Sequence, residues 1–101
     1  MPDDAEDRYE WDEAKRARNL LRHGLDFADA VGIWDGPALE RPSDRGLEQR
    51  FIAFGRVAGR VLALVYTPRA GRRRIISARM ANRDERDAYA TALRHRSHDR
   101  H

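Results

Sequence analysis

Three polar residues, Lys15, Asn19 and His23, recur at intervals of four in the first part of the chain. On an α-helix this spacing places their side chains along one stripe. The apolar residues of the same segment lie nearer the opposite side: Ala14, Ala17, Leu20 and Leu21. Imidazole and amine groups transfer protons, so the stripe is suited to acid–base chemistry. The alternative is a solvated helix face on which His23 complements the dipole at the helix end.

Basic residues dominate the second half of the chain, because residues 49–83 contain nine Arg and no Asp or Glu. Lys15 is the only Lys among the 20 basic residues. The planar guanidinium of Arg binds phosphates with two parallel hydrogen bonds. A GC-rich genome explains part of the preference for Arg over Lys, but it does not explain the missing acids. We therefore expect a surface that binds a polyanion.

Six Arg side chains are candidates for sequence-independent phosphate contacts, and the alternative for each is a solvated surface turn. They are Arg56, Arg60, Arg69, Arg72, Arg73 and Arg74.

Arg79 lies in the last predicted strand, where the odd-numbered residues 75–79 share one face and the even-numbered residues 74–78 share the other. An Arg in a strand with apolar neighbours requires an anion. Arg79 either clamps a phosphate or pairs with Glu10 or Glu85, and the sequence favours neither role. Glu85 also has a simple structural explanation, since it can cap a helix.

The elements that position these residues begin with a strand and two helices. The pattern predicts a strand over residues 9–11, a helix over residues 13–23, and a second helix from Asp26 through Trp34, ending near Gly36. Asp12 is a helix N-cap residue, and Gly24 suits the left-handed position that ends a helix.

A change to β-sheet patterning follows at Arg50, after a loop over residues 37–49 with a short edge strand near Leu39 and Glu40. The pattern predicts three consecutive strands that form a meander, with the sequences RFIAFG, VLALVYT and RRRIISAR. The middle run is apolar without alternation, which predicts a central strand covered on both faces. Asn82 and Glu85 form a capping box that opens a last helix through Leu93.

The order of elements predicts an α+β fold, in which a small antiparallel sheet packs against two N-terminal helices and a C-terminal helix. We expect the helices to cover one face of the sheet and leave the other free. Residues 1–8 are expected to be a mobile acidic extension, residues 9–94 a single domain, and residues 95–101 a disordered tail. The three His residues of that tail fit a frayed end better than a metal cluster, so no metal or cofactor is expected.

The cellular location follows from two absences in the sequence. No Cys is present, and no apolar run is as long as a membrane span or resembles a signal peptide. A reducing cytoplasm is the expected location.

Two sets of spaced residues, one in each half of the chain, form recognisable signatures. The front signature is Tyr9-Glu10-Trp11-Asp12 with Lys15, Asn19, His23-Gly24, Phe27 and Ala30. The back signature is Arg50-Phe51, Gly55, Arg60, Val65-Tyr66-Thr67 with Arg69, then Arg74-Ile75-Ile76-Ser77-Ala78-Arg79 with Ala81, Glu85 and Tyr89. Together the two signatures resemble the BrnT family of bacterial toxins, and the resemblance extends over residues 9 to about 93.

The resemblance implies a RelE-like fold and a metal-independent endoribonuclease that inhibits translation and growth. It also implies a BrnA-like antitoxin that dimerises and binds operator DNA. We expect the isolated chain to be monomeric or weakly associated and to form a two-plus-two assembly with this partner, anchored by apolar residues such as Trp34 or Phe51. Both Trp residues fit the core or a partner interface better than base stacking.

Metal-independent cleavage of RNA requires removal of the ribose 2′-hydroxyl proton, stabilisation of the phosphorane and protonation of the leaving 5′-oxygen. With the resemblance, Lys15 and His23 become candidates for the proton transfers, and Arg79 for charge stabilisation with Glu85 beside it. The alternative function is a non-catalytic Arg-rich module that binds nucleic acid. Only the enzyme turns over RNA and requires the 2′-hydroxyl. A DNA-binding regulator is disfavoured because the sequence contains no recognition-helix pair.

Overall fold

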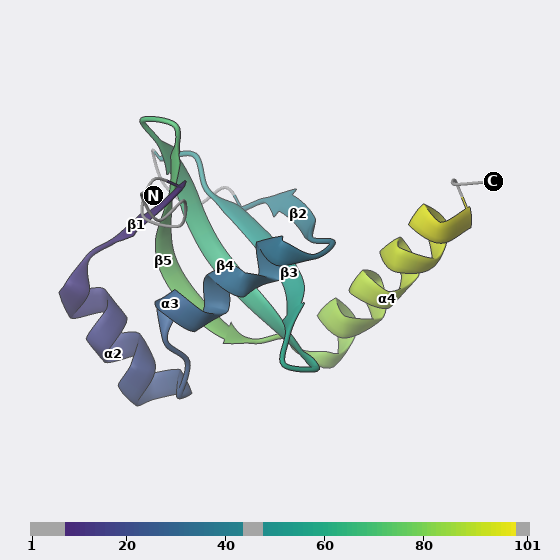
Figure 1. Ribbon diagram of the computed structural model, residues 1–101, viewed down its shortest axis with the longest axis horizontal. Helices are drawn as coiled ribbons and strands as arrows, with labels where there is room; N and C mark the ends of the chain where they lie inside the picture. The colour runs from purple at the N-terminus through teal and green to yellow at the C-terminus, as the bar shows by residue number, and fades with distance from the viewer. Residues whose placement is uncertain (1–7, 44–47, 99–101) are drawn as a thin grey trace, which may run out of the picture.

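The structure, a computed structural model, describes residues 8–43 and 48–98 as an α+β fold around one five-stranded sheet (Figure 1). The elements are β1 (Tyr9–Trp11), α2 (Glu13–His23), α3 (Phe27–Ala30), the 3-10 helix η1 (Val31–Asp35), β2 (Leu39–Pro42), β3 (Phe51–Val57), β4 (Arg60–Arg69), β5 (Arg72–Met80) and α4 (Arg83–His98). The predicted order is confirmed, including the edge strand β2. The acidic extension predicted for residues 1–8 falls almost entirely outside the described residues. None of the described helices is long and apolar enough to cross a membrane.

The sheet is mixed, with strand order β1-β5-β4-β3-β2. The last four strands of this order pair antiparallel, as the meander predicts. β1 pairs parallel with β5, from Tyr9 opposite Arg73 to Trp11 opposite Ile75. The prediction of a purely antiparallel sheet is therefore wrong, because a three-residue strand carries no local signal of the direction in which its distant neighbour runs. The RelE-like arrangement stays a prediction.

Both faces of the sheet are covered, at least in part. On one face Leu62 and Leu64 of β4 belong to a cluster with residues of α3 and η1. On the other face Ala63 of β4 and Phe54 of β3 pack with Tyr89 of α4. The expectation that all helices share one face is wrong, because the unbroken apolar run of β4 needs cover on both sides. Figure 1 shows α4 leaving the far end of the sheet, so it covers only part of its face.

The second predicted helix is shorter than expected. α3 gives way after Ala30 to the 3-10 helix η1, which crosses the sheet closely at Gly55. A Cβ atom built on Gly55 would lie 2.5 Å from the Cβ of Ile33, so only glycine allows this approach.

β5 contains one extra residue. Pairing with β4 passes from Val65 opposite Ser77 to Tyr66 opposite Ile75, which leaves Ile76 without a partner on β4. Such a bulge shifts the side-chain alternation by one residue. Ile75 and Ala78 are accordingly both buried in the same core cluster. The prediction that residues 75, 77 and 79 share a face is wrong for Ile75, whereas Ser77 and Arg79 still share one.

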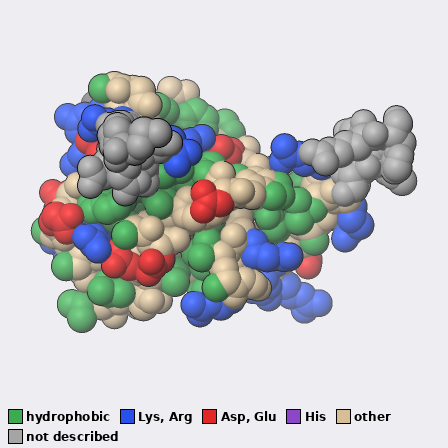
Figure 2. Space-filling model, viewed as in Figure 1, with side chains coloured by type: hydrophobic (Ala, Val, Ile, Leu, Met, Phe, Trp, Pro, Cys, Tyr) green, Lys and Arg blue, Asp and Glu red, His purple; other side chains and the backbone are tan. Residues whose placement is uncertain are grey.

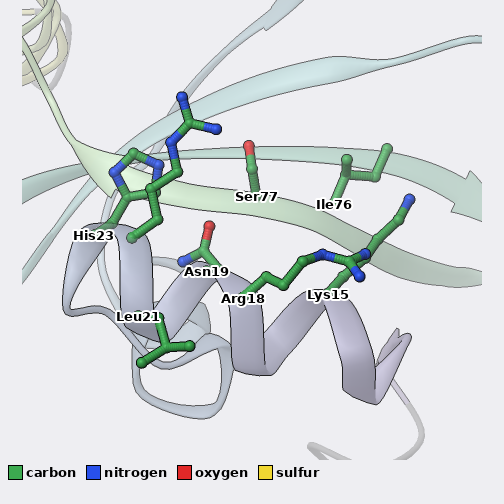
Figure 3. A pocket seen from close by; sticks show the side chains of 8 residues that line it. Lys15, Arg18, Asn19, Leu21, His23, Ile76 and Ser77 are labelled. Atoms are coloured by element: carbon green, nitrogen blue, oxygen red, sulfur yellow. The ribbon is translucent and has the colours of Figure 1, made fainter.

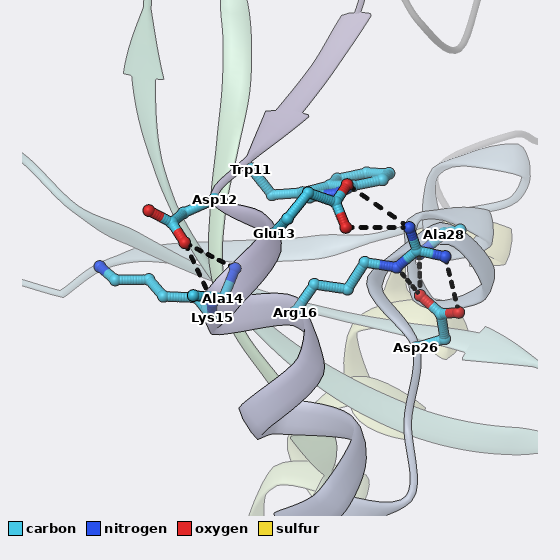
Figure 4. A network of polar contacts seen from close by, with 8 residues as sticks. All are labelled: Trp11, Asp12, Glu13, Ala14, Lys15, Arg16, Asp26 and Ala28. Atoms are coloured by element: carbon cyan, nitrogen blue, oxygen red, sulfur yellow. Dashed lines mark hydrogen bonds and ion pairs between the residues drawn. The ribbon is translucent and has the colours of Figure 1, made fainter.

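A polar network joins the N-terminal helices to each other (Figure 4). The guanidinium of Arg16 donates to both carboxylate oxygens of Asp26, at 2.7 and 3.0 Å, and also contacts Glu13. Trp11 donates its indole N–H to the same Glu13 at 3.0 Å. The hydrogen bonds from Arg16 lower the pKa of Asp26, with a further contribution from the N–H of Ala28.

The C-terminal helix is longer than the sequence pattern indicates. α4 runs through His98, so it extends into the segment that was expected to be a disordered tail from residue 95. Residues 99–101 lie outside the described residues.

Candidate active site

The first helix is fixed at both ends by the residues that the sequence predicts. The carboxylate of Asp12 accepts the backbone N–H groups of Ala14 at 2.8 Å and Lys15 at 3.1 Å. These bonds, chiefly the one from Lys15, lower the pKa of Asp12. At the other end Gly24 has φ +70° and donates its N–H to the carbonyl of Leu20 at 2.8 Å. Lys15 and His23 thus lie in the first and last turns of one well-bounded helix.

Asn19, midway between them, attaches the helix to the sheet. Its side-chain amide donates to the carbonyl oxygens of Ala78, at 2.8 Å, and Leu25, at 3.0 Å. Its carbonyl oxygen accepts the N–H of Ala78 at 3.1 Å. The amide therefore bonds both main-chain groups of Ala78 on the edge of β5, as a neighbouring strand would. Asn19 is buried, with 7% of its surface exposed, so its role is structural.

An open groove of about 530 Å³ lies between α2 and β5 (Figure 3). Its lining residues are Lys15, Arg18, Asn19, Leu21, Arg22 and His23 of α2 and Ile76 and Ser77 of β5. Figure 3 shows His23 at one end of the groove and Lys15 at the other, with Asn19 and Ser77 between them. Among the described residues, no acidic side chain lines it. The groove joins the two predicted proton-transfer residues in an electropositive site.

Arg18 and Arg22 were missed as site residues. They lie three and seven positions after Lys15, so they belong to the same helical stripe as Asn19 and His23. The helical period carries this signal in the sequence, although a spacing of four alone does not select these two residues. Ser77 had no such signal, because the bulge in β5 decides its direction.

Arg79 and Glu85 form an ion pair with each other. Two parallel hydrogen bonds of 2.7 and 2.9 Å join the guanidinium to the carboxylate. The pairing raises the pKa of Arg79 and lowers the pKa of Glu85. Of the two carboxylates considered for Arg79, the structure pairs it with Glu85. Neither residue lines the groove between α2 and β5.

The same carboxylate opens α4. The N–H of Asn82 donates to Glu85 at 2.8 Å, and the N–H of Glu85 donates to the side chain of Asn82 at 2.9 Å. The predicted capping box is confirmed. Glu85 thus joins the end of β5 to the start of α4, and 15% of its side chain is exposed.

Two of the six Arg residues proposed to contact phosphate are bound within the protein. Arg74 contacts Glu10 at 2.8 Å. Arg73 lies 4.5 Å from the centre of the Trp34 ring and 3.7 Å from a carboxylate oxygen of Glu40. That carboxylate also accepts the indole N–H of Trp34 at 3.3 Å. These two Arg side chains are therefore less available to RNA than the sequence indicated.

The other four Arg residues lie at two hairpins: Arg56 and Arg60 where β3 turns into β4, and Arg69 and Arg72 where β4 turns into β5. Arg56 stacks over the ring of Tyr89 at 6.0 Å, and Arg60 lines a separate cavity that also contains Asp26. Arg69 and Arg72 are exposed in the hairpin between β4 and β5. At roughly 3.3 Å per residue, Arg72 lies about 16 Å along β5 from Ser77.

The groove brings acid–base groups together with Arg18 and Arg22, which form no salt bridge within the described part of the chain. Residues 8–43 and 48–96 contain no group of three His, Cys, Asp or Glu side chains arranged to hold a metal ion. A small α+β domain with such a groove has the charge distribution that is typical of proteins that bind polyanions.

The chain also matches the model of a known protein family. The model of the BrnT family, ribonuclease toxins of type II toxin–antitoxin systems, matches residues 11–85. The chain therefore belongs to the BrnT family, and an antitoxin partner follows from that membership. No curated protein matches the chain.

Proposed function

We propose that this BrnT-family ribonuclease cleaves RNA without a metal ion, and that the groove between α2 and β5 is its active site. The observation that carries the proposal is the joint presence of Lys15 and His23 in one groove with Arg18 and Arg22. Acid–base groups beside cations, in a groove that no acidic side chain lines, meet the requirements of phosphodiester cleavage. The expected consequence in the cell is loss of translation and growth, with the toxin acting in the cytoplasm.

The reaction begins with an attack from within the substrate. His23 accepts the proton of the ribose 2′-hydroxyl, and the 2′-oxygen forms a bond to the adjacent phosphorus. Imidazole suits this step because it accepts protons near neutral pH. Lys15, at the far end of the groove, donates a proton to the 5′-oxygen as its bond to phosphorus breaks. The products are a 2′,3′-cyclic phosphate and a free 5′-hydroxyl.

The two Arg residues of the groove stabilise the negative charge that develops on the phosphate during the reaction. Arg18 and Arg22 are one turn apart on α2, so both can reach the non-bridging oxygens of one phosphate. Their positive charge stabilises the dianionic phosphorane more strongly than the monoanionic substrate, which lowers the barrier. Arg69 and Arg72, on the exposed hairpin, attract the RNA backbone without acting on the reacting atoms.

Arg79 and Glu85 are assigned a positioning role. Because both guanidinium Nη atoms of Arg79 already bind Glu85, little of its charge is left for a phosphate. The pair fixes the end of β5, and Ser77 lies on the same strand face two residues away. This proposal replaces direct catalysis by Arg79 and Glu85 with support for the strand that forms one wall of the groove.

The test is cleavage of a defined RNA by antitoxin-free protein in the presence of EDTA. Cleavage should continue, should leave 2′,3′-cyclic or 3′-phosphate ends, and should stop at a nucleotide that lacks its 2′-hydroxyl. Activity that EDTA abolishes and a divalent ion restores would contradict the mechanism. Binding of the same RNA without any product would favour the non-catalytic module instead.

A further inference from the structure

The apolar stripe of α2 faces solvent. Leu21 is 88% exposed and Leu20 is 46% exposed, and Ala14 and Ala17 are exposed beside them. Figure 2 shows hydrophobic side chains at the surface over α2. Polar residues attach the helix instead: Asn19 bonds to β5, and Arg16 bonds to Asp26 at the start of α3. α2 is thus amphipathic with its apolar side turned outward.

This orientation is the reverse of what a helix in a monomeric protein normally shows. Amphipathic helices usually bury their apolar side, which supplies most of their stability. Here hydrogen bonds and an ion pair attach the helix, and the apolar side remains uncovered. Ala14, Ala17 and Leu21 lie at positions i, i+3 and i+7, which is the pattern of anchors that one partner helix contacts.

Glu13 of the same helix face already contacts Arg16, so the charges beside the stripe that indicate the character of the partner are basic. Arg18 lies one turn from both Ala14 and Leu21, and Arg22 lies one turn beyond Arg18. Both side chains are exposed. A second copy of this chain would bring the same cations against one another, which is unfavourable. A segment with apolar residues on one side and acidic residues next to them would complement both features.

We infer that the stripe of α2 is the docking surface for an acidic amphipathic segment of the antitoxin. The inference rests on membership of the family, which requires an antitoxin, and on the exposed leucines with their adjacent arginines. It replaces the expected anchors Trp34 and Phe51, which are both partly buried in the aromatic core. If the proposed function holds, docking also inhibits cleavage directly, because Arg18 and Arg22 line the groove.

The test is the affinity of the purified cognate antitoxin for variants of α2, measured without RNA so that the result does not depend on the catalytic assignment. Leu21→Gln should weaken binding by roughly 30-fold, as expected for the loss of an apolar anchor. Leu20→Gln should weaken it less. Met80→Gln is the matched control, because Met80 is also an exposed apolar residue, 41% exposed, but lies on β5.

The contribution of the two basic side chains to antitoxin binding is tested by the double variant with Arg18→Gln and Arg22→Gln. Its association with the antitoxin should be slower by about tenfold at low ionic strength, and the difference should shrink as salt is added. Thermal unfolding should be unchanged in the Leu21 variant, because its side chain is almost fully exposed. A folded Leu21→Gln protein that binds the antitoxin as tightly as the Met80→Gln control would overturn the inference. So would a homodimer of the chain alone that Leu21→Gln converts to monomer.

Discussion

Two basic regions adjoin strand β5, but only one of them contains an acidic partner for its positive charge. In the groove between α2 and β5, four basic side chains lie together without an acidic neighbour in the lining. At the junction of β5 and α4, two residues further along the strand, the charge of Arg79 is matched by Glu85. A cation that is already paired gains little from a phosphate, since binding it would break existing hydrogen bonds. Arg content alone therefore does not identify a binding surface.

The largest expected effect comes from removing the acid–base groups of the groove. His23→Ala and Lys15→Ala should each lower the cleavage rate by about 10² to 10⁴, the usual contribution of a proton-transfer group. Both side chains are exposed, so the free energy of unfolding should not change. Single-turnover cleavage of a defined RNA measures the rate, and urea unfolding measures the stability. Near-normal cleavage by both folded variants would make the stripe an ordinary solvated helix face.

A second variant tests whether Asn19 attaches α2, which carries the groove residues Lys15 and His23, to the sheet. Asn19→Ala leaves the N–H and carbonyl of Ala78 without partners at a buried position, which should cost about 3 kcal/mol of unfolding free energy. The cleavage rate should fall as well, because α2 carries Lys15 and His23. Urea unfolding measures the loss. The matched control is Arg83→Ala at an exposed position, where a change within about 0.5 kcal/mol is expected.

The junction of β5 and α4 should show the reverse of the pattern expected for His23 and Lys15, with a loss of stability and little change in the cleavage rate. Arg79→Ala should lower the unfolding free energy by about 1 to 2 kcal/mol, less than for a fully buried pair because part of the pair is exposed to solvent. The cleavage rate should stay within about tenfold of the original. A double-mutant cycle with Glu85→Gln isolates the pair, and the second substitution should cost less once the first is made. A loss of 10² or more in rate with unchanged stability would return Arg79 to the catalytic group.

The smallest effect concerns pH. The carboxylate of Glu85 has a folded pKa below its ordinary value of 4.5, mainly because of the hydrogen bonds from Arg79. A lowered folded pKa stabilises the protein above the unfolded pKa, and this contribution is lost as pH falls through the folded value. Unfolding free energy should therefore decline below about pH 4.5, and Arg79→Ala should flatten that decline. Asp26, whose pKa is also lowered, should leave a residual slope in the variant. Identical profiles for the two proteins would contradict the assignment.

Much of the local structure could be predicted from the sequence. The cap at Asp12, the helix end at Gly24 and the capping box at Asn82 all depend on hydrogen bonds between residues at most four positions apart. The stripe that contains Lys15 and His23 follows from the period of the helix. Residue type and short spacing are sufficient in these cases, because the interacting groups are brought together by one element.

The tertiary structure decided which groups are available for chemistry. Asn19 and Ala78 are 59 positions apart, and Glu10 and Arg74 are 64 positions apart. No local pattern reports such contacts, since they depend on the parallel pairing of β1 with β5 and on the bulge at Ile76. The sequence by itself determined the helix stripe and the supply of cations. Only packing determined that Arg74 and Arg79 are paired with carboxylates while Arg18 and Arg22 form no ion pair with any residue that the structure describes, because a charge is matched by whichever side chains the fold places within hydrogen-bonding distance.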